Sequence, residues 1–407
     1  MSREFREQYR NRVAYPEDRE ELREALMDAV ASIAKDVEGS AQENETGRTL
    51  APAAVEALRK SGLPGMKSPR EIGGAEADPA LQIDVLEALT QVDAATGWAL
   101  LVANGIGARV LSAMPDEVVD EMFTAQELPF FAGSLKPDGI ARSVDGGYEI
   151  TGQWGWASGV AHADYVVAPV WTEDRSGVIW AVVPADRAEI HDNWFPLGMR
   201  GTGSSDFSLD QVFVPSRFIS TAGPPVRGGA LYRLGYGSAA HEHGIFAIAL
   251  ASKALETMIE TAEEKRRGYV AGSCVADREV FQAAIVKAEL RIKAARLLMV
   301  DTSERLFASA CDAAAPVALQ AEARAAAAGS SAALASARSR GSKLSARLRA
   351  EARRRAASSP SSASNSEVSV SAAPGAAPLP GAPSSVGPAS GSAMRSSRVG
   401  CILDLGS

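Results

Sequence analysis

The sequence predicts an α+β fold with an N-terminal α-helical domain, a central antiparallel β domain and a C-terminal helical bundle. Two observations predict this order. Apolar residues recur at helical spacing up to about residue 128 and again from 226 to 308. The stretch between them holds short alternating runs that are interrupted by Gly, Asp and Pro. We therefore expect domains over 1–128, 129–225 and 226–308, followed by a different segment over 309–407.

Three stretches of the N-terminal domain have helical character. ELREALMDAVASIAKDV (21–37) repeats apolar residues every three or four positions. APAAVEALRKSG (51–62) predicts a helix that ends at Gly62, because glycine adopts the left-handed conformation of a helix C-terminus without steric cost. The segment 81–111 is apolar enough to form a buried pair of helices.

Five short runs predict the strands of the central domain, and helical spacing then returns. The strand candidates are FFAGSL (130–135), YEITGQWGW (148–156), DYVVAPVW (164–171), GVIWAVVP (177–184) and DFSLDQVFVP (206–215). Residues 243–267 and 280–308 predict the first two helices of the C-terminal bundle.

Composition and charge exclude several classes of protein. A chain of 407 residues with 46% hydrophobic residues can build a real core. The formal net charge of −8 disfavours nucleic acid and anionic membranes as partners. The cysteines Cys274, Cys311 and Cys401 lie too far apart to predict a disulfide framework or a metal site. The N-terminal residues do not resemble a signal peptide and the most apolar run, 244–252, is too short to span a bilayer, so we expect a cytoplasmic protein.

The segment 309–407 has a different composition from the rest of the chain. It contains no aromatic residue and is dominated by Ala, Ser, Arg and Pro, as in residues 336–366. Such a segment cannot bury enough apolar area to offset its ordering entropy, so we expect most of it to be disordered. A basic helix over 333–356 is an alternative for its first part.

Two stretches of the central domain resemble the acyl-CoA dehydrogenase superfamily. The family pattern is a Tyr-x-Ile-x-Gly strand, then Trp, an aliphatic residue and Ser or Thr, then Ala-Asp. A later segment ends in a polar residue and Val-x-Val-Pro. The residues that fit are Tyr148, Ile150, Gly152, Trp156, Ser158, Ala163 and Asp164 in the first stretch, and Asp210, Val212, Val214 and Pro215 in the second.

The resemblance implies a flavin cofactor, FMN or FAD, enclosed by the three domains. Trp156 would pack against the isoalloxazine ring, and Ser158 would hydrogen-bond the N5 edge. An indole covers a large π-face at little conformational cost, and N5 is an atom whose hydrogen bonding tunes flavin chemistry. Trp154 lies two residues before Trp156, so on a strand the two share one face. We expect Trp154 to pack in the core, and core packing is also the alternative for Trp156.

Three further residues are implied as contacts of the cofactor. Gly133 and Ser134 stand where the family has a turn beside the pyrimidine ring, with an ordinary strand end as the alternative. Arg266, three residues before Tyr269, resembles the family's Arg-x-x-Phe pair, which contacts the cofactor's phosphates across a subunit interface. A solvated helical charge is the alternative for Arg266.

Two chemistries are open within the superfamily. Dehydrogenases remove a proton next to a thioester with a glutamate, whereas a second branch takes reduced flavin from a separate flavin reductase and hydroxylates an aromatic or heteroatom substrate with oxygen. Trp-Gly-Trp-Ala-Ser-Gly (154–159) and Gly-Met-Arg-Gly-Thr-Gly-Ser-Ser-Asp (198–206) resemble the second branch, in which we expect Thr202 and Ser204 to be turn residues. We expect a flavin-dependent oxidoreductase acting on a small molecule, with a homotetramer implied by the resemblance.

Several polar residues are candidates for catalysis, among them Ser158. Glu242 is near the position of the base in some dehydrogenases, although a solvated carboxylate in the first turn of a helix is the expected alternative. His243 is a candidate for the active cavity, with capping or packing as the alternative. Asn104 and His162 are candidates for binding substrate. Asn104 could equally be a satisfied core amide, and we expect His162 in the pocket wall.

The end of the chain departs from the family pattern. Both branches close the bundle with two more long helices, and the second branch carries polar motifs there that have no counterpart after Phe307. We hypothesise that residues 309–407 arise from translation out of register, which would leave the bundle incomplete and the activity impaired. A catalytically silent flavin-binding or scaffold paralogue is a further alternative.

Overall fold

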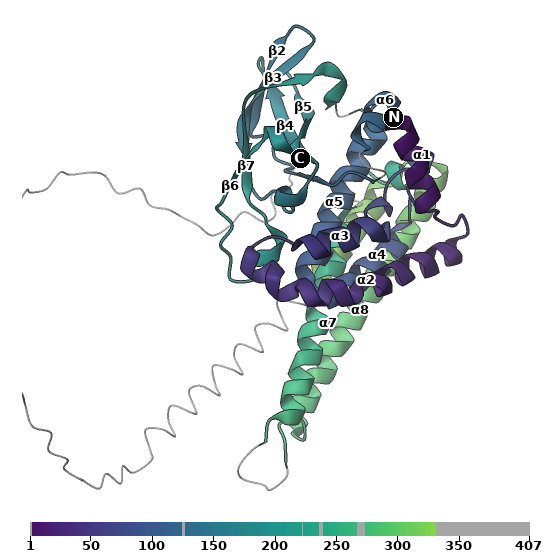
Figure 1. Cartoon of the computed structure of the whole chain (residues 1–407). Helices are drawn as coiled ribbons and strands as arrows, with labels where there is room; N and C mark the ends of the chain where they lie inside the picture. Colours follow the sequence, from purple (N-terminus) through teal and green to yellow (C-terminus); the bar gives the residue numbers. More distant parts are fainter. Residues whose placement is uncertain (1, 124–126, 222, 236–238, 267–272, 331–407) are drawn as a thin grey trace, which may run out of the picture. The chain divides into compact units, whose positions relative to one another are not determined.

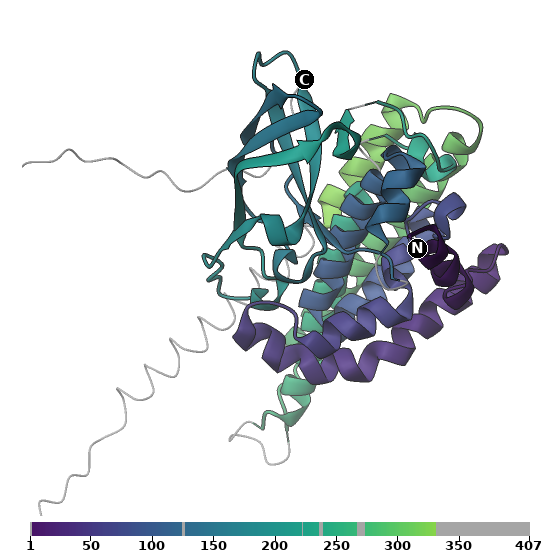
Figure 2. The same cartoon turned by 45° about the horizontal axis from the view of Figure 1, so that its top comes forward.

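The computed structural model describes residues 2–123, 127–221, 223–235, 239–266 and 273–330 of the 407-residue chain. Within these ranges helices come first, a sheet follows and helices return, which confirms the predicted α+β class (Figure 1). Figure 2 shows the strands, in teal, on one side of the helices.

The N-terminal helices begin and end at recognisable caps. Asp18 accepts hydrogen bonds from two backbone N–H groups in the first turn of α2, and Asp78 does the same for α4. Gly62, with a φ of 78°, ends α3 as predicted. The helices are α1 (Ser2–Arg12), α2 (Arg19–Gly47), α3 (Pro52–Ser61), α4 (Pro79–Val92), α5 (Ala94–Ala113) and α6 (Asp116–Met122).

Helix α5 is the most apolar of these helices. Among the residues that the structure describes, it is the one helix that is long and apolar enough to cross a membrane. However, 61% of its apolar window is buried inside the fold, and the helix packs between α4 and the first strand. This burial is typical of a core helix.

Eight strands in the described part of the chain form one sheet, in the order β6-β7-β3-β2-β4-β5-β8, with β1 paired to β4 off this path. They are β1 (Phe131–Gly133), β2 (Gly139–Val144), β3 (Gly147–Trp154), β4 (Tyr165–Thr172), β5 (Val178–Pro184), β6 (Glu189–His191), β7 (Asp206–Pro215) and β8 (Ile219–Thr221). Short 3₁₀ turns connect the elements, at Leu63–Gly65, Arg70–Ile72, Val160–His162, Ala185–Arg187, Arg200–Thr202, Ser216–Phe218 and Ala230–Arg233.

The sheet is not wholly antiparallel as predicted. Strands β1 and β2 both run parallel to β4, whereas the other pairings are antiparallel. The reason is the connection after β3. The chain leaves the β2–β3 hairpin, crosses through the turn Val160–His162 and enters β4 on the far side of β2, so β4 runs in the same direction as β2.

The indole of Trp154 anchors the end of β3 in the core. It is completely buried and stacks on Phe207 of β7, with ring centroids 5.1 Å apart. Its Nε1–H donates a hydrogen bond to the Pro169 carbonyl at 2.9 Å. Gly139 and Gly152 leave room for the ring, because a Cβ atom at either position would lie within 2.8 Å of an indole carbon.

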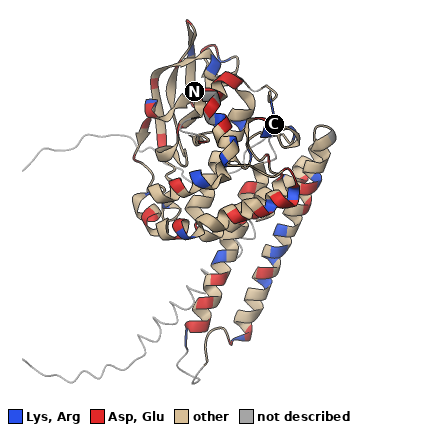
Figure 3. Ribbon diagram, turned by 45° about the vertical axis from the view of Figure 1, so that its right-hand side comes forward, with Lys and Arg blue, Asp and Glu red and all other residues tan. Residues whose placement is uncertain are grey.

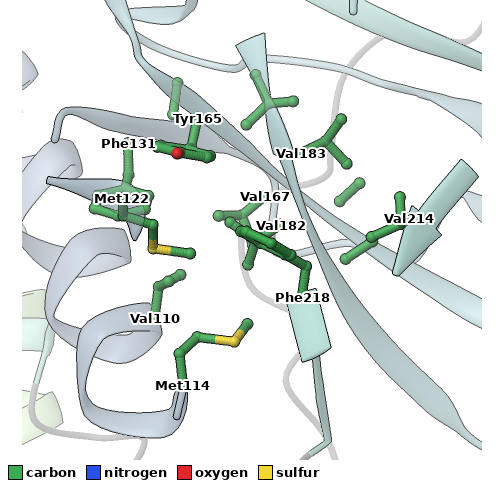
Figure 4. Close-up of a cluster of buried hydrophobic side chains, with 14 of the residues drawn as sticks. Val110, Met114, Met122, Phe131, Tyr165, Val167, Val182, Val183, Val214 and Phe218 are labelled. Atoms are coloured by element: carbon green, nitrogen blue, oxygen red, sulfur yellow. The ribbon is translucent and has the colours of Figure 1, made fainter. Parts of the chain in front are cut away.

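One face of the sheet packs against α5 and α6. Figure 4 shows Val110, Met114 and Met122 from the helical side meeting aromatic and aliphatic side chains of the strands. The facing residues are Phe131, Tyr165, Val167, Val182, Val183, Val214 and Phe218. This cluster fixes the sheet against α5, whose N-terminal half reaches the candidate site described below.

The C-terminal block consists of α7 (Ala240–Glu264) and α8 (Glu279–Asp312), and residues 317–330 are helical as well. Helix α7 packs against α4 and α8. Helical structure therefore continues beyond residue 308, where the sequence places the end of the bundle. The expected disorder of the last part of the chain falls on residues 331–407, which lie outside the described residues.

Candidate functional site

The chain changes direction directly after β3. Gly155 follows the last strand residue, and Trp156 adopts a left-handed backbone conformation with a φ of 60°. Its indole is 75% exposed, whereas that of Trp154 is buried. The prediction that the two rings share one face is therefore wrong, because the strand ends between them and its alternation no longer applies.

Ser158 lies beneath this turn, almost completely buried. Its Oγ accepts a hydrogen bond from Trp98 Nε1–H at 2.9 Å and lies 2.7 Å from Ser204 Oγ. Ser204 Oγ in turn lies 2.8 Å from Thr202 Oγ1, and the Thr202 hydroxyl donates to the Met199 carbonyl at 2.8 Å. These contacts join residues of α5, the turn after β3 and the loop before β7.

Sequence reasoning missed the partners of Ser158. Thr202 and Ser204 do lie in and just after a 3₁₀ turn, as expected, but both hydroxyls are buried and bonded to each other. Trp98 could not be singled out because it is one apolar residue in an apolar helix. The one available signal was the pair of hydroxyl residues in Gly-Thr-Gly-Ser-Ser.

Trp98 also connects Ser158 to the C-terminal block. His243, exposed on α7, packs edge-on against the indole with ring centroids 5.6 Å apart, and Phe246 packs against it at 4.9 Å. His243 Nδ1 lies 3.1 Å from the Ala239 carbonyl. The structure thus places two predicted catalytic residues, Ser158 and His243, against one tryptophan that separates them.

A small pocket opens beside Ser158, with room for about one water molecule. Its walls are mostly apolar and come from α3, α5, β1 and the turn after β3. The lining residues are Leu58, Ala99, Leu100, Ala103, Phe130, Phe131, Ser158, Gly159 and His162. His162, which is predicted beside the wall of the flavin pocket, lines this small cavity.

His162 is the polar group of this pocket that lacks a partner. Its Nδ1 atom is buried and makes no hydrogen bond. Burial, with a smaller contribution from the Arg59 guanidinium, lowers the pKa of His162 from 6.5 to about 4. Arg59 is held close by Asp164, whose carboxylate it contacts at 2.9 Å. The imidazole is therefore neutral at pH 7 and can donate or accept a hydrogen bond in the pocket.

Asn104 belongs to the core. Its Oδ1 accepts from the Lys67 backbone N–H at 3.3 Å, and its Nδ2 donates to the carbonyls of Leu63 and Leu100 at 3.1 and 3.2 Å. The residue before it in α5, Ala103, lines the pocket instead. Of the two predictions for Asn104, the geometry matches the satisfied core amide.

Glu242 is not a solvated carboxylate, and this expectation is wrong. It is buried in the first turn of α7 and forms an ion pair with Lys67 from the loop after α3. Lys67 is itself nearly buried, and its carbonyl accepts a hydrogen bond from the Tyr232 hydroxyl at 2.5 Å. The pair ties the N-terminal helices to α7, across 175 residues of sequence.

The remaining predicted cofactor residues lie at the ends of elements. Gly133 ends β1 so close to β4 that a Cβ atom would lie 2.4 Å from the Val167 carbonyl oxygen. Ser134 follows it, and its Oγ accepts from the Lys136 backbone N–H at 3.3 Å. Arg266 is exposed after α7, in an isolated bridge with Cys274. Its expected companion Tyr269 lies outside the described residues.

The described residues contain no group of three or more His, Cys, Asp or Glu side chains that could hold a metal ion. The polar and aromatic groups that meet at the site are hydroxyl, imidazole and indole groups. An exposed indole next to a buried hydroxyl fits a flat aromatic ligand with a polar edge.

Family models confirm the resemblance seen in the sequence. The N-terminal domain of acyl-CoA dehydrogenases matches residues 16–123, and their C-terminal domain matches residues 242–342. The second match continues past residue 308. Both models lie outside the sheet, which carries the Trp156 and Ser158 pattern, so the two signals are independent.

Individual relatives and structures give the same picture. A pigment production hydroxylase from Rhodococcus sp. is 34% identical over 196 residues, which are 47% of this chain and 50% of the relative. The HsaA oxygenase subunit of a flavin-dependent monooxygenase from Mycobacterium tuberculosis is 29% identical over 316 residues, 74% of this chain and 80% of the relative. The structure of XiaF from Streptomyces sp., in complex with FADH2 and glycerol, shares the fold with a TM-score of 0.71 and 24% identity, covering 78% of this chain and 83% of that one.

Removing one member of the buried ion pair is expected to destabilise the fold. Glu242→Ala leaves the Lys67 ammonium buried without a partner, so the free energy of unfolding should fall by about 3 to 5 kcal/mol in urea titrations. The double variant Lys67→Met, Glu242→Leu should be more stable than either single variant. Lys60→Ala, in the exposed ion pair with Glu56, is the control and should unfold like the native chain. Native stability of Glu242→Ala would contradict the burial of this pair.

The low pKa of His162 predicts a loss of stability in mild acid. Between pH 6.5 and about 4 the unfolded chain binds a proton that the folded chain does not, so the free energy of unfolding falls as the pH is lowered through this window. The contribution reaches about 3 kcal/mol at pH 4. His162→Gln should lose this part of the pH dependence, measured by urea unfolding between pH 8 and 4. Parallel curves for the two proteins would show that His162 is not buried in its neutral form.

Proposed function

Since this chain belongs to the acyl-CoA dehydrogenase family, we propose that it is the oxygenase component of a two-component flavin-dependent monooxygenase. It would hydroxylate an aromatic or heteroatom-containing small molecule with dioxygen, using reduced FMN or FAD supplied by a separate flavin reductase. The observation that carries this proposal is the exposed indole of Trp156 beside the buried hydroxyl of Ser158. The names of the relatives, a hydroxylase and an oxygenase subunit, point in the same direction.

The residues present fit a flavin. Trp156 offers an uncovered aromatic face, and Ser158 has one lone pair that no protein group occupies. Gly133 and Ser134 would meet the pyrimidine ring, and Arg266 the phosphates. Reduced flavin, when bound, supplies the electrons with which dioxygen is activated.

The pocket beside Ser158 would receive the polar end of the substrate. Its walls are mostly apolar, and His162, whose Nδ1 atom makes no hydrogen bond, could bind a hydroxyl there without introducing a charge. Asn104, the neighbour of the pocket residue Ala103, holds the chain at Leu63 and Lys67 against α5. His243, which is exposed on the other side of Trp98, would hydrogen-bond a substrate or exchange a proton with solvent.

A dehydrogenase reaction is less compatible with this geometry. Its base would be Glu242, and a base must reach the proton that it removes. Here Lys67 holds the Glu242 carboxylate in a buried ion pair, within the packing of α7 against the N-terminal helices. The pair would have to break before the carboxylate could act.

Helix α8 carries an apolar stripe that a second copy of the chain would cover. Val286, Leu290 and Leu297 are each more than half exposed, and their spacing of four and seven residues places them on one face of the helix. Charged residues occupy other positions along the two long helices (Figure 3). We propose a homotetramer in which this stripe is buried.

Anaerobic titration with reduced FMN and reduced FAD tests the cofactor. We expect saturable binding by the native chain. Ser158→Ala should weaken binding about five-fold, the value of one hydrogen bond, and Trp156→Ala about ten-fold because a stacking face is lost. Ser40→Ala, which removes an equally buried hydroxyl of α2, is the control.

Incorporation of labelled oxygen into a product tests the monooxygenase reaction itself. Mixing the reduced complex with isotopically labelled dioxygen and a panel of phenols and indoles should yield a product that carries the label. Absence of flavin binding, or binding without labelled product for any substrate of the panel, counts against the monooxygenase.

Sedimentation velocity tests the tetramer. Leu290→Glu and Leu297→Glu place charges in the proposed interface, so the native tetramer should dissociate into smaller species. Val226→Glu is the control, because Val226 is equally exposed but lies in the loop after β8. A monomeric native chain, or variants that sediment as the native chain does, would contradict the interface.

A further inference from the structure

The three hydroxyl groups beneath the candidate site form a chain whose direction can be worked out. We define this hydroxyl chain as Ser158, Ser204 and Thr202. At its inner end Thr202 donates its single hydroxyl proton to the Met199 carbonyl, which can only accept. In its contact with Ser204, at 2.8 Å, Thr202 must therefore be the acceptor, and Ser204 is the donor.

The direction of the next hydrogen bond in the hydroxyl chain is fixed in the same way. Because Ser204 donates its single hydroxyl proton to Thr202, it can only accept in its 2.7 Å contact with Ser158. The donor in that contact is therefore Ser158. Ser158 also accepts from Trp98 Nε1–H at 2.9 Å. A hydroxyl has one proton and two lone pairs, so Ser158 retains one lone pair and no proton for a ligand. Toward a ligand it is a hydrogen-bond acceptor.

We propose that Thr202 and Ser204 are positioning residues that hold Ser158 as an acceptor toward N5 of the flavin, and so make the site select the reduced cofactor. The inference rests on the proposed function. N5 of reduced flavin carries a hydrogen and can donate to Ser158, whereas N5 of oxidised flavin is an acceptor and meets a lone pair. The selection arises from the direction of the protein's own hydrogen bonds. It requires no change in the charge of any of these residues.

The strength of this selection equals the free-energy cost of reversing the direction of these hydrogen bonds. If Thr202 donated to Ser204, and Ser204 to Ser158, the Ser158 proton would be free for oxidised flavin. That arrangement keeps the contacts between the hydroxyls and the bond from Trp98, but it loses the bond from Thr202 to Met199. One hydrogen bond corresponds to a preference of about five-fold.

The test compares the dissociation constants of oxidised and reduced flavin for each variant. Thr202→Val and Ser204→Ala each release the Ser158 proton, so the ratio of the oxidised to the reduced constant should fall about five-fold relative to the native chain. Thr202→Ser keeps the hydroxyl and should keep the native ratio, as should the control Ser40→Ala. A merely structural defect would weaken both redox states alike and leave the ratio unchanged.

Repeating the Ser204→Ala substitution in a Ser158→Ala variant tests whether the effect of Ser204 passes through Ser158. In Ser158→Ala the acceptor is gone, so adding Ser204→Ala should leave the ratio as it is in the single variant. Native ratios in Thr202→Val and Ser204→Ala, or an equal effect of Ser204→Ala without Ser158, would overturn the inference while flavin binding by the native chain still supports the proposed function. Failure of the native chain to bind either redox state would overturn both.

Discussion

The position of the candidate site depends on the burial of Trp154. Its indole fills the space that Gly139 and Gly152 leave open and stacks on Phe207, which fixes the end of β3 within the sheet. The strand ends at Trp154, and the chain turns at Gly155 and Trp156. The turn carries Trp156 to the surface and Ser158 inward.

Three parts of the chain then meet around Ser158. The strand turn supplies the hydroxyl, α5 supplies the indole of Trp98, and the loop before β7 supplies Ser204. Helix α7 reaches the other side of Trp98 through His243 and is held to the N-terminal helices by the ion pair of Glu242. The site thus lies where the sheet meets the helices, and its geometry depends on the packing between them.

The order of helices and strands could be predicted because periodicity is a local property of the sequence. Trp156 and Ser158 could also be singled out from the sequence, since both belong to one contiguous pattern. Trp98, Thr202 and Ser204 were not, because each meets Ser158 only through folding. The burial of Glu242 escaped prediction for the same reason, as its partner Lys67 lies 175 residues away. The parallel pairing of β2 with β4 depends on a crossover that strand propensity does not encode.

The backbone at Trp156 has a consequence for how this protein can evolve. A bulky residue with a φ of 60° is strained by about 1 to 2 kcal/mol, and an indole that is 75% exposed adds little burial in return. Glycine adopts this backbone conformation without strain, so thermal stability does not by itself favour tryptophan at this position. Retention of tryptophan at this position is therefore a marker that separates members under functional constraint from copies that have drifted free of it.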